Sequence, residues 1–115
     1  MATKEEIKNL MDGMVAKLNE VGPYVSDDWG GSVQFIFPDL NTGWLLKLTM
    51  EGSVEFCEER IDEDFADGVI EFNSDILVGI MNKSINAQEV KADGRMKLRK
   101  SLDALGKIML PATSS

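Results

Sequence analysis

The chain contains no histidine and a single cysteine, Cys57, among its 115 residues. One cysteine cannot form an intramolecular disulfide. Without histidine the chain also lacks the commonest general base and the imidazole ligands of a Cys/His zinc site. Nucleophilic catalysis by a serine or cysteine paired with a histidine is excluded as well. The sequence therefore argues against an enzyme, and we expect no catalytic residue, no metal ion and no cofactor.

Long apolar runs are also missing, since none approaches the roughly 20 residues of a membrane-spanning helix. Residues 1–6 are charged where a signal peptide would be apolar, so we expect a cytoplasmic protein. The hydrophobic share of 43% is nevertheless that of an ordinary folded chain. We expect residues 1–115 to form one domain with a mobile tail from about residue 111.

Positive charge is scarce in the middle of the chain. The net charge of −8 divides into −3 for residues 1–50, −9 for residues 51–75 and +4 for residues 76–115. An acidic middle disfavours nucleic acid as a partner, because phosphate binding requires a basic surface. The acidic run 62–64 lacks the alternating ligands and the glycine of a calcium loop and is interpreted as a solvated loop. Acidic neighbours raise the pKa of a thiol, which indicates that Cys57 is unreactive.

The hydrophobic pattern predicts a helix, three strands, a fourth strand, a helix, a fifth strand and a last helix. The first helix begins at the capping pair Thr3 and Glu6 and ends at Gly22-Pro23. Strands are expected over residues 32–37, 43–50 and 53–59, with Val54 and Phe56 both pointing inward and a tight turn at residues 51–52. This order predicts an α+β domain of two layers, in which helices cover the apolar face of a sheet.

In the second half, residues 69–72 are predicted to form a strand, and Ser74 is predicted to cap the following helix. Residues 84–93 read as a loop or a short helix. Residues 95–99 read as a strand with Met96 and Leu98 on one side. A last helix over residues 101–109 ends before Pro111. Seven methionines are many for this length, and they suit an adaptable apolar interior as well as simple gap filling.

Residues 66–83, followed by Gly94-Arg95-Met96-Lys97-Leu98, resemble the sterol carrier protein type-2 family. That family shows an Ala-Asp-led strand, a Ser-Asp-capped helix with a Gly-Lys ending, and then Gly-Lys-x-Lys-x leading into a strand and a final helix. Asn82-Lys83 and Gly94-Arg95 stand here where Gly-Lys is usual. Lys100-Ser101 replaces the family's Gly-Asp, and Ala87 replaces a frequent proline.

The resemblance implies a five-stranded, mainly antiparallel sheet with helices on one face and an apolar cavity between the layers. It also implies a non-catalytic carrier of a lipid-like molecule such as a fatty acid, an acyl-coenzyme A or a sterol. The inward faces of the predicted elements supply the candidate cavity residues, which are Phe35, Phe37, Leu46, Phe56, Ile80, Met81, Leu105 and Met109.

Two alternatives stay open at this point. The apolar helix surface could pack on a protein partner, which would make the domain an interaction or oligomerisation module. Six basic residues could rim the cavity and bind an anionic headgroup, or Arg95 and Lys97 could pair with acids such as Glu71 on the neighbouring strand. The six are Lys83, Arg95, Lys97, Arg99, Lys100 and Lys107. Oligomeric state and a transient membrane contact are not decided by the sequence.

Overall fold

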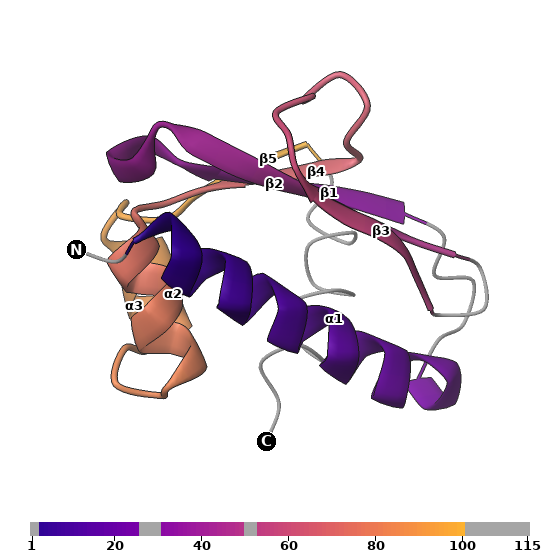
Figure 1. Cartoon of the computed structure of the whole chain (residues 1–115). Helices are drawn as coiled ribbons and strands as arrows, with labels where there is room; N and C mark the ends of the chain where they lie inside the picture. The colour runs from indigo at the N-terminus through magenta and orange to yellow at the C-terminus, as the bar shows by residue number, and fades with distance from the viewer. Residues whose placement is uncertain (1–2, 26–30, 50–52, 101–115) are drawn as a thin grey trace.

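The computed structural model describes residues 3–25, 31–49 and 53–100. Their order of elements agrees with the predicted one (Figure 1). The helices are α1 (Lys4–Val25), the 3-10 turn η1 (Pro38–Leu40), α2 (Ser74–Met81) and α3 (Ala87–Ala92). The strands are β1 (Gly31–Phe37), β2 (Thr42–Leu48), β3 (Val54–Glu59), β4 (Gly68–Glu71) and β5 (Lys97–Lys100).

The five strands form one sheet in the order β3-β2-β1-β4-β5. All neighbours are antiparallel except β1 and β4, which run parallel with Val33 opposite Gly68 and Ile36 opposite Glu71. Figure 1 shows α1, α2 and α3 on the same side of the sheet. The predicted α+β class and its mainly antiparallel sheet are therefore confirmed.

Helix α1 begins as predicted but ends later. The backbone N–H of Glu6 donates to Thr3 Oγ1 at 3.1 Å, which is the expected N-terminal cap. The helix continues to Val25, so the prediction that Gly22-Pro23 ends it is wrong. A proline lacks the N–H that bonds one turn back. Because Pro23 lies in the last turn, that lost bond affects only the end of the helix.

The main core lies between the sheet and the helices. One face of β1 and β2 supplies alternate apolar residues, and α1 supplies residues spaced by three and four positions. The buried members of this main cluster are Ile7, Met11, Met14, Leu18, Val33, Phe35, Phe37, Trp44, Leu46, Leu48, Ile70, Phe72, Ile76, Leu77, Ile80, Val90 and Met96.

The opposite face of the sheet carries a second, smaller cluster, which the sequence did not predict. Leu45, Ala66 and Val69 are buried there, with Ile36 and Phe56 packed against them. Phe56 reaches this face because the β2–β3 register shifts between Lys47 and Leu48. A bulge of this kind inserts one extra residue, so the side chains before and after it switch between the two faces of the sheet. The prediction that Val54 and Phe56 share one face is thus wrong, since Val54 packs against the main cluster.

The start of α2 is held by a residue from elsewhere in the chain. Asn73 is the N-cap, and its side chain makes no capping hydrogen bond. Ser74 does not act as the predicted cap. Instead, its backbone N–H and its hydroxyl donate to the two carboxylate oxygens of Asp39, at 2.9 and 2.5 Å. Asp39 from η1 therefore satisfies the first turn of α2.

Two further predictions lie outside the described residues, namely the tight turn at residues 51–52 and the helix over residues 101–109. The strand after the 84–93 segment begins at Lys97 rather than at residue 95. Met96 is buried in the main cluster and Leu98 packs against it. The prediction that these two residues lie on the same side of the strand is therefore confirmed.

Candidate functional site

The apolar layer between sheet and helices brings together five of the eight predicted cavity residues. Phe35 and Phe37 are fully buried in the main cluster, and Leu46 and Ile80 are almost fully buried there. Met81 is partly buried and packs against the cluster. Phe56 lies on the other side of the sheet and cannot line this layer. Leu105 and Met109 lie outside the described residues. Whether these side chains enclose a cavity stays a prediction.

Aromatic and sulfur-bearing side chains form much of this layer. Phe37 packs edge-on against Trp44, with ring centroids 5.9 Å apart, and stacks on Phe72 at 5.5 Å. Phe72 was not among the predicted site residues, although its place at the end of the predicted fourth strand could have suggested it. Met11 and Met14 are buried in the same cluster. Flexible thioethers adapt to irregular apolar shapes more readily than branched side chains do.

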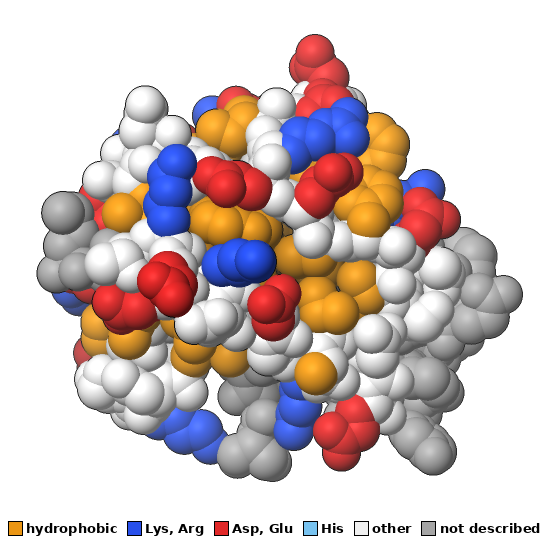
Figure 2. All heavy atoms as spheres, viewed as in Figure 1, with side chains coloured by type: hydrophobic (Ala, Val, Ile, Leu, Met, Phe, Trp, Pro, Cys, Tyr) orange, Lys and Arg blue, Asp and Glu red, His pale blue; other side chains and the backbone are white. Residues whose placement is uncertain are grey.

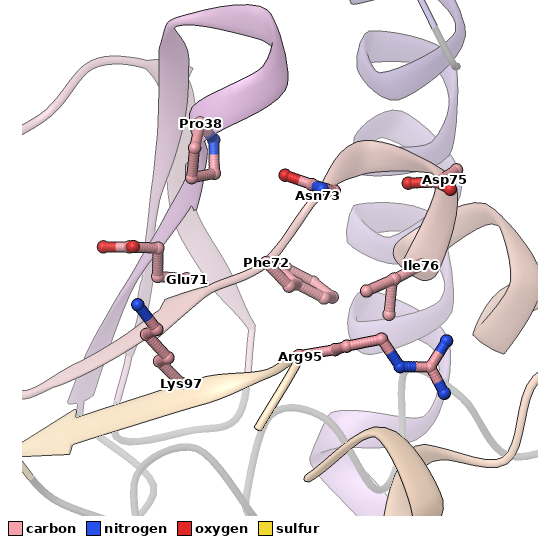
Figure 3. Close-up of a pocket in the computed structure, with 8 residues that line it drawn as sticks. All are labelled: Pro38, Glu71, Phe72, Asn73, Asp75, Ile76, Arg95 and Lys97. Carbon is pink, nitrogen blue, oxygen red and sulfur yellow. The ribbon is translucent and has the colours of Figure 1, made fainter. Parts of the chain in front are cut away.

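A pocket of about 260 Å³ opens where β4 leads into α2. Figure 3 shows the side chains around this pocket, which come from η1, from β4 and the start of α2, and from Arg95 just before β5 and Lys97 at its start. Its apolar residues include Phe72 and Ile76, which are both members of the main cluster. Its charged residues are balanced, since they are Glu71, Asp75, Arg95 and Lys97.

A second pocket, of about 270 Å³, lies between α1 and the edge formed by β2 and β3. Met11 and Trp44 from the main cluster line it together with Cys57. Burial, together with the negative charges of Asp12 and Glu58, raises the pKa of the Cys57 thiol to about 11. The thiol is therefore protonated at neutral pH, as the acidic surroundings predicted.

Neither pocket is the predicted apolar cavity, because Phe35, Leu46 and Ile80 line neither of them. Each is also slightly smaller than the roughly 300 Å³ at which small-molecule sites begin. Both pockets reach members of the main cluster from the margin of the apolar layer.

The basic residues near β5 make several contacts within the chain, and whether they rim a lipid cavity stays a prediction. Arg99, rather than Arg95, reaches Glu71 (3.3 Å), and it also pairs with Glu63 (2.7 Å). Arg95 pairs with Asp93 at 2.7 Å, so the predicted pairing of Arg95 with Glu71 is wrong. The amine of Lys100 donates to the carbonyl groups of Glu63 and Ala66. Lys83 is exposed in the turn after α2, and Lys107 lies outside the described residues.

In residues 3–25, 31–49 and 53–100, no three side chains of Asp, Glu, Cys or His come together as metal ligands would. None of the helices in the same ranges has the length and apolar character needed to cross a bilayer.

No protein-family model matches the sequence, and no curated protein matches it either. Solved structures do match. The solution structure of palmitated sterol carrier protein 2-like 2 from Aedes aegypti superposes with a TM-score of 0.72 at 14% identity, over 94% of this chain and 95% of that chain. A crystal structure of sterol carrier protein 2 matches with a TM-score of 0.64 at 19% identity, over 91% of this chain and 88% of that one.

This chain has the sterol carrier protein 2 fold. The same fold forms part of a larger protein, a stereoselective inverting sec-alkylsulfatase from Pseudomonas sp., which matches over 88% of this chain with a TM-score of 0.65 at 17% identity. The chain spans only 13–14% of the length of the alkylsulfatase chains that it matches.

Proposed function

We propose that this sterol carrier protein 2-like domain binds a lipid-like molecule, such as a fatty acid, between its sheet and its helices. The observation that carries the proposal is the main cluster itself, a layer of aromatic, aliphatic and methionine side chains under helices on one face of the sheet. Apolar burial contributes about 25 cal/mol per Å², so an acyl chain in this layer would bind tightly with few polar contacts.

The fold comparison supports the same proposal. One of the matching structures is a palmitated form, so a protein of this fold is known with palmitate. In this chain the proposed lipid contacts are the predicted cavity residues Phe35, Phe37, Leu46, Ile80 and Met81, together with Leu105 and Met109.

The proposed role is binding and carriage rather than catalysis, in a soluble cytoplasmic setting. The chain has no histidine, and its one thiol is protonated at neutral pH. The match to the alkylsulfatase covers only 14% of that chain, so it gives no support for that protein's activity in this domain.

The first experiment is organic extraction of the purified protein followed by mass spectrometry, with calorimetric titration of palmitate into the delipidated protein. We expect a co-purified lipid or saturable binding of about one palmitate per chain. A lipid-free protein that forms a constitutive oligomer and fails to bind palmitate would overturn the proposal in favour of an interaction module.

A pair of tryptophan variants tests the location. Met81→Trp adds bulk at the margin of the main cluster, and Phe56→Trp adds bulk at a half-buried site on the opposite face of the sheet. We expect Met81→Trp to weaken palmitate binding about tenfold or more, and Phe56→Trp to leave it within about twofold. Equal effects of the two variants would show that the ligand lies elsewhere.

A further inference from the structure

The loop between β3 and β4, residues 60–67, presents two large apolar side chains to solvent. Ile61 is 54% exposed and Phe65 is 43% exposed, and among the described residues they are the exposed large hydrophobic side chains. Figure 1 shows this loop rising from the face of the sheet opposite the helices. Figure 2 shows apolar surface interspersed with acidic and basic side chains in the same part of the molecule.

The loop is anchored by a buried amide, that of Gln34. Its Nε2 donates to the carbonyls of Phe35 (2.9 Å), Trp44 (3.1 Å) and Arg60 (2.9 Å), and its Oε1 accepts from the Asp62 N–H at 2.7 Å. Asp62 continues the network, because its Oδ1 accepts from the Phe65 N–H at 3.3 Å. The side-chain hydrogen bonds of Gln34 therefore fix the loop from below.

Close packing at β2 also holds this loop in place. A Cβ at Gly43 would lie 2.3 Å from the Phe35 carbonyl oxygen, 2.9 Å from Gln34 Nε2 and 3.0 Å from Ile61 Cγ1. Only a glycine leaves room for the amide and the loop to approach the strand. The exposed side chains thus sit on a preorganised backbone, and preorganisation lowers the entropic cost of binding.

The surroundings of the two apolar side chains are acidic. Residues 58–67 contain six acidic side chains and one arginine, for a net charge of −5. Phe65 packs at 6.0 Å from Phe56, and its ring is approached by Lys47 Nζ at 5.6 Å and by the Arg60 guanidinium at 5.9 Å. Both cations pair with acids of this chain, Lys47 with Glu55 and Arg60 with Glu58 and Asp62. From β5, Arg99 pairs with Glu63, and the Lys100 amine donates to the Glu63 carbonyl. The acids of residues 58–67 still outnumber these cations, and the exposed Asp64 takes part in none of these ion pairs. A partner that covers Phe65 would therefore meet excess negative charge around an aromatic face that attracts cations.

We propose that Ile61, Phe65 and the acidic side chains Asp62, Glu63 and Asp64, here termed the loop surface, dock a basic amphipathic segment of a protein partner. Apolar residues of that segment would cover Ile61 and Phe65, and its lysines or arginines would face the acids. The loop surface lies on the opposite side of the sheet from the apolar layer. Docking is thus independent of the proposed lipid binding.

The probe is a synthetic amphipathic helix of leucine and lysine, titrated into the full chain and followed by fluorescence anisotropy. The matched probe keeps the leucines and replaces each lysine with glutamate. We expect the basic peptide to bind, more weakly at high salt, and the acidic peptide not to bind. Phe65→Ser should weaken binding at least about tenfold, and Phe65→Leu should retain most of the affinity.

Charge variants separate a local effect from the net charge of the protein. Asp64→Asn removes an acid of the loop surface, and Glu89→Gln removes an exposed acid on α3. Of these two variants, only Asp64→Asn should weaken the binding of the basic peptide. The proposal is overturned if both peptides bind alike, if Phe65→Ser binds as the parent does, or if Phe65→Ser instead abolishes a self-association that would make a second copy the occupant. Circular dichroism spectra matching those of the parent establish that each variant is folded.

Discussion

The carboxylate of Asp39 accepts two hydrogen bonds from Ser74, one from its backbone N–H and one from its hydroxyl. Asp39 lies in η1 directly after β1, and Ser74 is the first residue of α2. The pair therefore fastens the helix layer to the end of the sheet, next to the pocket that contains Asn73 and Asp75. An anionic group at this position also stabilises the positive end of the helix.

Replacing Asp39 with alanine should lower the free energy of unfolding by about 1–2 kcal/mol, because it removes a charge-assisted cap from a short helix. Asp39→Asn keeps one acceptor oxygen and should lose less. Urea denaturation measures both changes. Asp75→Ala, in the same first turn but exposed, serves as the control and should cost no more than about 0.3–1 kcal/mol. If Asp75→Ala lowered the free energy of unfolding as much as Asp39→Ala, the assignment of Asp39 as the cap of α2 would be contradicted.

Gln34→Leu should release the β3–β4 loop. The substitution leaves the Asp62 N–H and the Arg60 carbonyl without their buried partner, which costs about 1–3 kcal/mol for each group that water cannot reach. Hydrogen exchange followed by mass spectrometry should show faster exchange for residues 60–66 than in the parent. Gln88→Leu, at an exposed position on α3, should change neither exchange nor stability. Unchanged protection of the loop in Gln34→Leu would show that Gln34 does not anchor it.

Cys57 should react slowly with iodoacetamide at pH 8 and faster as the pH approaches 11, because the protonated thiol is a poor nucleophile. Its pKa in the folded chain exceeds the ordinary value of 9.0, so the unfolded chain ionises first. The resulting stability is fully present below pH 9 and is lost as the pH rises through 11. Thiolate absorbance gives the pKa directly. Glu58→Gln should lower the pKa, since one of its causes is the charge of Glu58, and a value near 9 in the parent would refute burial as the cause.

The affinity for fatty acids should rise with chain length if the ligand lies in the apolar layer. Each buried methylene contributes about 0.8 kcal/mol, so two additional methylenes should tighten binding by up to about fifteenfold. Calorimetric titration of lauric, myristic and palmitic acids measures the series. A flat series would indicate that only the carboxylate is recognised.

The periodicity of apolar residues in the sequence was sufficient to predict most of the helices and strands. Apolar residues three and four positions apart (Ile7, Met11, Met14 and Leu18) are buried on α1, and Phe35 and Phe37 are buried on the apolar face predicted for β1. Such patterns are decisive because one face of each element contacts the core and the other contacts water.

The errors arose where contacts distant in the sequence override local patterns. The bulge in β3 that turns Phe56 to the other face depends on pairing with β2, which no local period reveals. The cap of α2 comes from Asp39, 35 residues before Ser74, so a rule for adjacent residues chose Ser74 itself. Gln34 alternates with the apolar residues of β1, yet it is buried beneath a loop that arrives from 26 and more residues later in the sequence.

The parallel pairing of β1 with β4 has a consequence for the order of folding. The strands β1, β2 and β3 follow one another and pair with their neighbours, whereas β4 must return across the meander to bring Gly68 beside Val33. Contacts between distant residues form more slowly, because the chain between them loses entropy before the contact stabilises it. We therefore expect the meander to form in the folding transition state and β4 to dock afterwards. In stopped-flow experiments Leu46→Ala should slow folding, while Val69→Ala should mainly accelerate unfolding.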